Sequence, residues 1–313
     1  MIYLNIAGRC GNQMFQYSFA RKLSILNNNE EITIDFYLMD EYAKIHNDPT
    51  FRDELCGFEA SKHYIKIIDG SNKIYKFGSK KQIFVFKVYT KIKRILQKFI
   101  KDKRIANKLL YGVMSHYGIY WYKAPKKLIK CNQKNKFVFG YFEDTTYFND
   151  IKKVLIEDFS PIYSVNKENQ EIYRIVKNSE SVCVSFRQWE TTGGTNVAIR
   201  QVCDKGYYIK AFDYYNKNLP DALFVIFSNN MEWVRENFDL PENCIFESGN
   251  DPVYEKVRLM SSCTHFILSN STFAWWVQYL GQSEDKIVVS PDRWYNGEKK
   301  RNPLILENFT VVS

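Results

Sequence analysis

The sequence lacks the features of several large protein classes. None of its apolar runs reaches the roughly 18 residues that a membrane-spanning helix needs, and its start, MIYLNIAG, has no basic-then-apolar leader, so we expect neither a spanning segment nor export. Seven cysteines are scattered without a C-x-x-C pair, which is not the arrangement of a disulfide framework or a zinc site. We therefore expect reduced, mostly buried thiols in a cytoplasmic protein.

The signatures of metal and phosphate-loop chemistry are also missing. No two aspartates stand two positions apart, so a D-x-D metal clamp is absent, and there is no G-x-x-x-x-G-K-[ST] loop, no H-E-x-x-H and no G-x-S-x-G turn. The four histidines are dispersed along the chain. We therefore expect no catalytic metal and no bound cofactor.

What the sequence does contain is a strand and helix rhythm. The 313 residues, 45% of them hydrophobic, can form a sizeable core and two domains of ordinary size. From about residue 181, apolar runs alternate with helical patterns: strands are expected at 182–186, 223–227, 244–246, 265–268 and 286–289, and helices at 207–218, 231–238, 252–262 and 272–280. This order predicts a parallel sheet covered by helices. The first half opens similarly, with strands at 2–6 and 32–36 around a helix from Met14 to about Leu26, and then becomes irregular to about residue 136. We place the domain boundary near Ser160-Pro161.

The net charge of +9 is concentrated in one segment. Residues 87–108 hold nine lysines and arginines and a single acidic residue. Apolar side chains recur there at helical spacing, at Val88, Ile92, Ile95 and Phe99, which predicts a basic amphipathic helix. Two interpretations stay open: the helix lies on an anionic membrane, or it is a solvated helix that packs on its own domain through this apolar stripe. No nucleic-acid partner is expected, because no recognition motif accompanies the charge.

Polar turns follow four of the expected strands. They are residues 8–13, 187–190, 228–230 and 269–273. Because ligands of open parallel sheets bind beyond the carboxyl ends of the strands, we expect these turns to line one cleft. Glycines allow close approach of the backbone, the fork of Arg187 suits a phosphate, and a helix N-terminus after Ser269 favours an anion. The pattern indicates a nucleotide or phosphate ligand, although Ser228-Asn229-Asn230 can also be a simple N-cap for the helix with Trp233, and the turn after Ser269 is a cap in either case.

Five segments resemble the α-1,2-fucosyltransferases, glycosyltransferase family eleven. In chain order, GRCGNQMFQYSFA is similar to the family's G-G-x-G-N-Q-[ML]-F-Q-Y-A, FGYFEDTTYF to G-Y-[FW]-Q-x-x-x-Y-F, FVIFSNNMEWVRENF to F-S-D-D-x-x-W, LMSSCTHFILSNSTFAWWVQYL to S-N-S-[TS]-F-[AS]-W-W, and KIVVSPDRWYN to P-x-x-W-[FY]. The resemblance implies an α/β fold of the glycosyltransferase B type, with two Rossmann-like domains facing a central cleft. Residues 1–160 would be the acceptor side and residues 161–313 the GDP-sugar side, with the last segment packing back on the first domain.

The resemblance also implies a reaction. The protein would be an inverting, metal-independent enzyme that moves L-fucose from GDP-β-L-fucose to a sugar hydroxyl in α-1,2 linkage, with a galactoside of a surface glycan such as O-antigen or capsule as acceptor. Contacts to the donor are expected from Gly8, Gly11, Asn12, Arg187, Ser228, Asn270, Ser271, Thr272 and Phe273. Arg187 and Asn12 are also expected to act in catalysis. Glu190 is the candidate base, with an ordinary solvent-facing carboxylate as its alternative, and Glu143 and Asp144 are outlying candidates. Tyr141 and Trp189 are candidates for stacking on a sugar.

Two departures from the family pattern keep other functions open. Where the family has H-x-R-R-G-D-Y, this chain has SFRQWET at residues 185–191, so only the first arginine is kept, and F-S-D-D is replaced by FSNN at residues 227–230. The alternatives are a transferase of the same fold that uses another GDP-sugar, and a nucleotide- or glycan-binding protein without catalysis. The acceptor pocket is expected within residues 37–136, and the basic helix would hold the enzyme near lipid-linked acceptors at the inner face of the plasma membrane.

Overall fold

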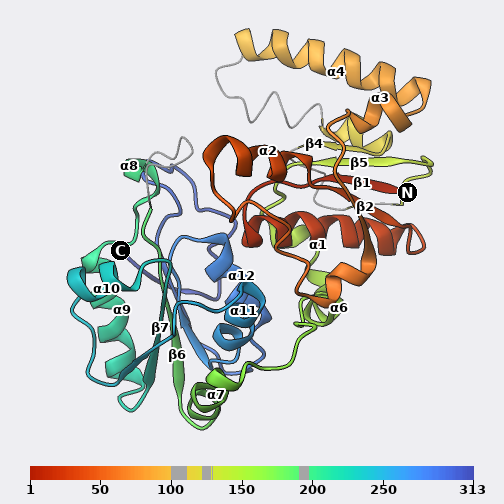
Figure 1. Cartoon of the computed structure of the whole chain (residues 1–313). Coiled ribbons are helices and arrows are strands. Elements are labelled where there is room, and N and C mark those ends of the chain that lie inside the picture. The colour runs from red at the N-terminus through yellow and green to blue at the C-terminus, as the bar shows by residue number, and fades with distance from the viewer. Residues whose placement is uncertain (100–110, 122–127, 129, 190–196) are drawn as a thin grey trace. The chain divides into compact units, whose positions relative to one another are not determined.

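The computed structural model of the chain describes residues 1–99, 111–121, 128, 130–189 and 197–313. The chain divides into two compact units, unit 1 (Met1–Phe159) and unit 2 (Ser160–Ser313). Each unit is built on its own parallel sheet (Figure 1). None of the helices in these described ranges is both long enough and apolar enough to span a bilayer.

Unit 1 contains a five-stranded sheet in the order β3-β2-β1-β5-β4, with every pair parallel. Its strands are β1 (Ile2–Asn5), β2 (Ile32–Asp35), β3 (Tyr64–Ile67), β4 (Ile119–Trp121) and β5 (Lys136–Phe139). Its α-helices include α1 (Cys10–Leu26), α2 (Tyr37–His46), α3 (Lys73–Phe77), α4 (Lys80–Phe99) and α6 (Lys152–Asp158), and short 3-10 helices are η1 (Glu59–His63), η2 (Thr145–Tyr147) and η3 (Asn149–Ile151). Figure 1 shows α3 and α4 on one side of this sheet and α1 on the other.

The part of unit 1 that we expected to be irregular contains regular elements. Between residues 37 and 136 the structure has α2, β3, α3 and β4 in addition to α4. Helix α4 confirms the first part of the basic amphipathic helix predicted at residues 87–108 but begins earlier, at Lys80, and residues 100–108 lie outside the described residues. The strands β3 and β4 have four and three residues, which is too short for a period-two pattern to stand out. Outside the predicted basic helix, the expectation of an irregular middle region is therefore wrong.

Unit 2 contains a six-stranded parallel sheet in the order β11-β10-β9-β6-β7-β8. Its strands are β6 (Ser181–Phe186), β7 (Leu223–Ser228), β8 (Cys244–Phe246), β9 (His265–Ile267), β10 (Val288–Pro291) and β11 (Thr310–Val312). Its helices include η4 (Lys167–Asn169), α7 (Gln170–Lys177), α8 (Val197–Arg200), α9 (Lys205–Asn218), α10 (Met231–Asn237), α11 (Val253–Ser261) and α12 (Thr272–Leu280). Counted from β6, this is the 3-2-1-4-5-6 strand order of the Rossmann fold.

The predicted α/β fold with two Rossmann-like parallel sheets, one in each unit, is confirmed. Each strand and helix expected after residue 181 is present, with ends within two residues of the expected ones. The last segment contributes β11, which pairs with β10 in the sheet of unit 2. Its packing on the first domain, the cleft and the assignment of acceptor and donor sides stay predictions.

Candidate functional site

The strand order of unit 2 reverses between β6 and β9. Ligands of open α/β sheets bind beyond the carboxyl ends of the strands at such a switch point, because the loops that leave the two strands diverge there. Here β6 leads into Arg187 and β9 leads into the turn before α12. The hydroxyl oxygens of Ser185 and Ser269 lie 3.0 Å apart, which ties the two strand ends together. The fold thus brings two of the predicted polar turns to one point.

Two buried tyrosines at the start of α9 brace these strand ends. The Tyr207 hydroxyl donates to the Leu268 carbonyl at 2.6 Å, and the Tyr208 hydroxyl donates to the Ser185 carbonyl at 2.9 Å. Burial raises the pKa of both phenols well above the ordinary value, so both stay protonated donors. Sequence reasoning missed this brace; its only signal was the Tyr-Tyr pair on a helix expected to pack on the sheet.

Two arginines lie beside the ring of Trp189. The Cζ atom of Arg187 lies 5.1 Å from the ring centroid, and the Cζ atom of Arg200, at the end of α8, lies 4.9 Å from it. The two guanidinium groups are therefore within about 10 Å of each other. In the described ranges no carboxylate forms an ion pair with Arg200. Two guanidinium groups beside one ring form a cationic patch, and such a patch would favour a bound anion.

Arg200 is a residue that the sequence did not single out. It lies outside the motif around Arg187 and reaches Trp189 only through the fold. Its guanidinium also faces the ring of Tyr295, with Cζ at 5.8 Å from the centroid. A second cation thus stands near the position that we predicted for a phosphate.

Asn270 tethers three loops of unit 2. Its Nδ2 donates to the carbonyls of Arg200 and Trp294 at 2.7 and 2.9 Å. Its Oδ1 accepts from Nε1 of Trp189 at 3.4 Å and from the thiol of Cys203 at 3.7 Å. The side chain is buried, and both amide hydrogens are used within the protein. A positioning role follows for Asn270, while a contact of this side chain with the donor stays a prediction.

The first turn of α12 is more accessible than the rest of the helix. Ser271 stands at the N-cap position, as the expectation of a cap at this turn implied, but its side chain makes no capping hydrogen bond. Ser271, Thr272 and Phe273 are half-buried, whereas residues 274–280 are buried. No acidic residue lies in this first turn, and the positive end of the helix dipole therefore favours an anion there.

The turn after β7 is a helix cap, as its simpler interpretation predicted. Oδ1 of Asn230 accepts from the backbone N–H of Trp233 at 3.0 Å, and Oγ of Ser228 accepts from the backbone N–H of Asn230 at 3.0 Å. A contact of Ser228 with the donor stays a prediction.

The two departures from the family pattern meet in the structure. The backbone N–H of Gln188 donates to Oδ1 of Asn229 at 2.9 Å, and Nδ2 of Asn230 donates to Oε1 of Gln188 at 2.9 Å. The family pattern has an arginine and two aspartates at these positions, whereas this chain has amides on both loops. In this chain the two loops are therefore linked by hydrogen bonds that involve uncharged amide side chains.

In unit 1 the segment GRCGNQ is largely the first turn of a helix. Arg9 has an extended backbone and serves as N-cap, and α1 begins at Cys10 rather than at Met14, so the expected start was wrong. Gly11 and Asn12 therefore lie on the helix, and Asn12 is half-buried. Gly8 alone has the left-handed backbone of a tight turn, with φ +81°.

Two buried glutamines hold this turn in place. Nε2 of Gln13 donates to the carbonyls of Gly8 at 2.9 Å and Arg52 at 2.7 Å. The side chain of Gln16 forms two hydrogen bonds with the backbone of Ala7: its Nε2 donates to the Ala7 carbonyl and its Oε1 accepts from the Ala7 N–H. The sequence analysis named the glycines and Asn12 as donor contacts, which stays a prediction. It did not identify the two glutamines that hold the turn.

We expect Gly8→Ala to lower the free energy of unfolding by about 1–2 kcal/mol. A Cβ at this position would stand 2.5 Å from Nδ2 of Asn12, and the residue would keep a left-handed backbone. Urea unfolding measures the change. Gly112→Ala is the control, since no atom of the described residues, apart from its chain neighbours and its own helix, lies within 4 Å of its Cβ position. Equal effects of the two substitutions would contradict a strained turn at Gly8.

The candidate bases are placed differently. Glu190 lies outside the described residues. Oδ1 of Asp144 accepts from the backbone N–H and the hydroxyl of Thr146, at 2.9 and 2.7 Å, so this carboxylate caps η2. Glu143 is half-buried and Tyr141 is exposed. The identity of the base stays a prediction.

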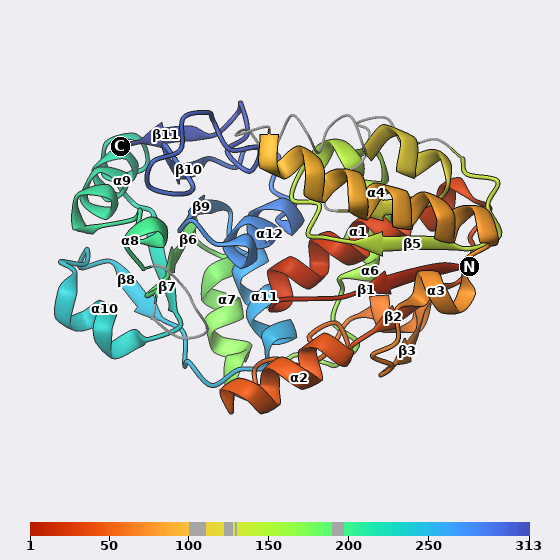
Figure 2. The ribbon, with the colours of Figure 1, turned by 90° about the horizontal axis from the view of Figure 1, so that it is seen from above.

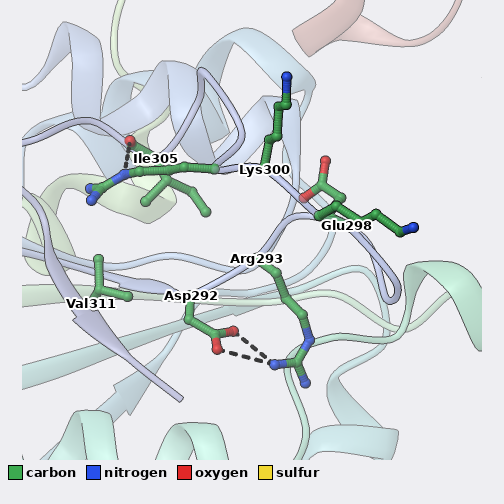
Figure 3. A pocket seen from close by; sticks show the side chains of 8 residues that line it. Asp292, Arg293, Glu298, Lys300, Ile305 and Val311 are labelled. Carbon is green, nitrogen blue, oxygen red and sulfur yellow. Dashed lines mark hydrogen bonds and ion pairs between the residues drawn. The ribbon is translucent and has the colours of Figure 1, made fainter. Parts of the chain in front are cut away.

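A charged cavity of about 440 Å³ lies beside the loop after β10 (Figure 3). Its charged groups are largely satisfied by their neighbours: Nη1 of Arg293 binds both carboxylate oxygens of Asp292 at 2.9 and 3.1 Å, and Glu298 accepts from the backbone N–H of Trp294 at 2.8 Å. Figure 3 shows Lys300 extending away from the Asp292–Arg293 pair. We therefore place the candidate anion site at the switch point rather than in this cavity.

No metal-binding cluster is found in the part of the chain that the structure describes, where no three His, Cys, Asp or Glu side chains gather in a suitable way. Metal independence itself stays a prediction, to be tested with a chelator.

Comparison with known proteins identifies the family. The family described as glycosyl transferase family 11 matches residues 1–310. The chain is 25% identical over 311 residues to the O-antigen biosynthesis glycosyltransferase WbnK of Escherichia coli, with 96% of each chain covered. It is 25% identical over 305 residues to an α-1,2-colitosyltransferase of E. coli, which covers 96% of this chain and 94% of that one. Galactoside α-(1,2)-fucosyltransferase 2 of Oryctolagus cuniculus is 25% identical over 150 residues, 45% of this chain and 42% of that protein. The resemblance seen in the motifs is confirmed, and the chain belongs to glycosyl transferase family 11.

Proposed function

We propose that this glycosyltransferase is inverting and metal-independent and that it transfers L-fucose from GDP-β-L-fucose to a galactoside in α-1,2 linkage, in the synthesis of an O-antigen or similar surface glycan. The observation that carries the proposal is the arginine pair beside Trp189 at the switch point of unit 2. The names of relatives support its finer parts: one acts in O-antigen biosynthesis and one is a galactoside α-(1,2)-fucosyltransferase.

The diphosphate of the donor is the group that the arginine pair would bind. In a single displacement the acceptor oxygen attacks the anomeric carbon as the bond to the diphosphate breaks, and negative charge grows on the leaving GDP. The guanidinium groups of Arg187 and Arg200 and the N-terminus of α12 would stabilise this charge, which is the part that a metal plays in other transferases. The acceptor proton would pass to a base, for which Glu190 is our candidate.

Arg200 would supply the second cation that the altered motif has lost. The family pattern has its second arginine where this chain has Gln188, whose side chain is bound to Asn230. Arg200 instead approaches Trp189 from α8, and Asn270 holds the Arg200 carbonyl. We infer that the donor site keeps two guanidinium groups although the motif keeps one.

A second candidate function is transfer of another GDP-sugar. The altered loops at Gln188 and Asn229 and the colitosyltransferase relative favour it. Colitose is L-fucose without its 3-hydroxyl, so the two donors differ by one polar group. A site that hydrogen-bonds this hydroxyl rejects the analogue that lacks it by roughly 10⁴-fold.

The experiment is a transfer assay with GDP-fucose and GDP-colitose, each with a β-galactoside acceptor and a chelator. We expect fucosyl transfer, with an α-1,2 linkage in the product and a much lower kcat/KM for the colitosyl donor. A higher kcat/KM for GDP-colitose would overturn the fucosyl assignment and support the second candidate. Binding of GDP-fucose without transfer to any acceptor of a broad panel would indicate a protein that has lost catalysis.

We further propose that the reaction takes place in the cytoplasm and that the acceptor is lipid-linked. Helix α4 of unit 1 would make the contact with the inner face of the membrane.

A further inference from the structure

Helix α4 is fixed to unit 1 at its first turn. The backbone N–H of Ser79 donates to Oε1 of Gln82 at 2.9 Å, and the N–H of Gln82 donates to Oγ of Ser79 at 3.2 Å, which is a reciprocal capping box. Nε2 of Gln82 also donates to the carbonyls of Tyr117 and Asn135, both at 2.8 Å. The start and the rotation of the helix are thus set by four hydrogen bonds.

One face of α4 packs on the sheet of unit 1. Phe86 and Tyr89 are buried in a cluster with Tyr3, Ile119 and Phe137. Farther along the same face, Nζ of Lys93 lies 5.7 Å from the centroid of Trp121, and burial lowers the pKa of this lysine. Figures 1 and 2 show α4 as an outer layer over β5.

The apolar stripe of the helix points away from this cluster. The exposed fractions are 67% for Phe84, 38% for Val88 and Ile92, 48% for Ile95 and 81% for Phe99. At 3.6 residues per turn the stripe lies roughly 130° around the helix from Phe86 and Tyr89. The interpretation that α4 packs on its domain through this stripe is therefore wrong, because a second apolar pair does the packing.

A row of cations flanks the stripe. Exposed basic side chains follow each other along one side of it, at Lys80, Lys87, Lys91, Arg94 and Lys98. The same periodicity places this row roughly 90° from the stripe. The 20 residues of α4 contain seven Lys or Arg and no Asp or Glu. The outer face of α4 is thus half apolar and half cationic.

We propose that this outer face binds the surface of an anionic lipid bilayer, with the stripe from Phe84 to Phe99 among the acyl chains and the basic row at the headgroups. Charge complementarity selects this occupant: a second copy of the chain would bring the same cations and be repelled, whereas an anionic bilayer offers phosphates beside an apolar layer. The helix is already folded and anchored by its other face, so it does not have to order on binding. The inference concerns a different surface from the donor site.

The test is flotation of the full chain with vesicles. One set is phosphatidylcholine alone, and the other is phosphatidylcholine and phosphatidylglycerol in equal parts. We expect binding to the anionic set only, and weaker binding as salt is raised. Lys87→Gln/Lys91→Gln/Lys98→Gln should weaken it by about 100-fold, since each basic residue near an anionic surface contributes about fivefold. Ile95→Ser/Phe99→Ser should weaken it by at least about tenfold through lost apolar burial.

Matched control variants distinguish binding through this face of α4 from binding caused by the overall charge and exposed apolar area of the protein. Lys153→Gln/Lys167→Gln/Lys217→Gln removes three exposed lysines elsewhere, and Ile68→Ser/Ile209→Ser removes two exposed apolar side chains. Both controls should bind as the unaltered chain does, and the melting temperature should be unchanged in every variant. Failure of the unaltered chain to bind anionic vesicles would overturn the proposal, as would full binding by Ile95→Ser/Phe99→Ser or equal losses in the controls. The flotation assay contains neither a sugar donor nor an acceptor. Its outcome therefore does not depend on whether the proposed fucosyltransferase activity is correct.

Discussion

Arg187→Ala should lower kcat/KM by about 10²–10³-fold, with the larger part in kcat. Arg187 follows β6 at the switch point of unit 2, where its guanidinium and that of Arg200 lie beside Trp189. Charge on the diphosphate grows as GDP leaves, so a cation at this point stabilises the transition state more than the bound donor. Steady-state kinetics with GDP-fucose measure the loss, and titration with GDP should show a smaller loss of affinity.

Arg174→Ala is the matched control for this prediction. Arg174 is an exposed arginine of the same unit that pairs with Glu171, and its removal should leave kcat/KM within about twofold.

Arg200→Ala should also lower kcat/KM. The variant that lacks both Arg187 and Arg200 should lose less transition-state stabilisation than the sum of the two single losses, because both cations face one anion. Unchanged kinetics in Arg187→Ala would place the diphosphate elsewhere, with the cavity beside Arg293 as the next candidate.

Asn270→Ala should destabilise the protein by about 2–4 kcal/mol and weaken GDP binding. The substitution leaves the carbonyls of Arg200 and Trp294 without their donor, and each such loss at a buried group costs about 1–3 kcal/mol. It also releases Trp189, whose Nε1 donates to this side chain. The arginine pair would then be less well positioned, so GDP affinity should fall even where the protein is fully folded.

Urea unfolding and GDP titration at low temperature separate the two effects of Asn270→Ala. Asn218→Ala is a suitable comparison, because this exposed amide donates to the carbonyl of Tyr214 within its own helix. We expect this substitution to lower the free energy of unfolding by less than about 0.5 kcal/mol. A loss of stability at Asn270 with unchanged GDP affinity would show that the tether does not position the donor site.

Much of unit 2 could be predicted because its signals are local. The strands β6, β7 and β9 are apolar runs followed by polar residues, and α9 and α10 begin after side-chain caps at Asp204 and Asn230. The sequence analysis did not predict α7, α8 or β11. The carboxyl ends of parallel strands meet at one edge of a sheet. The sequence alone therefore predicted that Arg187 and Ser269 lie near each other. The sequence could not show how Asn270 divides its hydrogen bonds, because its partners lie on three separate loops.

Other features depend on contacts that the sequence does not contain. Arg200 joins Trp189 through the fold, so no motif around Arg187 could reveal it. Helix α4 has two apolar sets, Phe86 with Tyr89 and the stripe from Phe84 to Phe99, and periodicity alone cannot tell which one faces the sheet. The sequence analysis placed the start of α1 too late, because Gly11 and Asn12 suggested a longer turn. In the structure the helix begins directly after the extended backbone of Arg9.

The central claim is that the arginine pair of unit 2 forms a metal-free site for a GDP-sugar. Calorimetric titration of the protein in the presence of a chelator tests this claim most directly. GDP, GDP-fucose and UDP-galactose are the ligands, and Arg187→Ala/Arg200→Ala is the comparison. We predict binding of GDP and GDP-fucose that the chelator does not change, little binding of UDP-galactose, and loss of GDP binding in the double variant. Loss of binding on chelation, or equal GDP affinity in the double variant, would contradict the account.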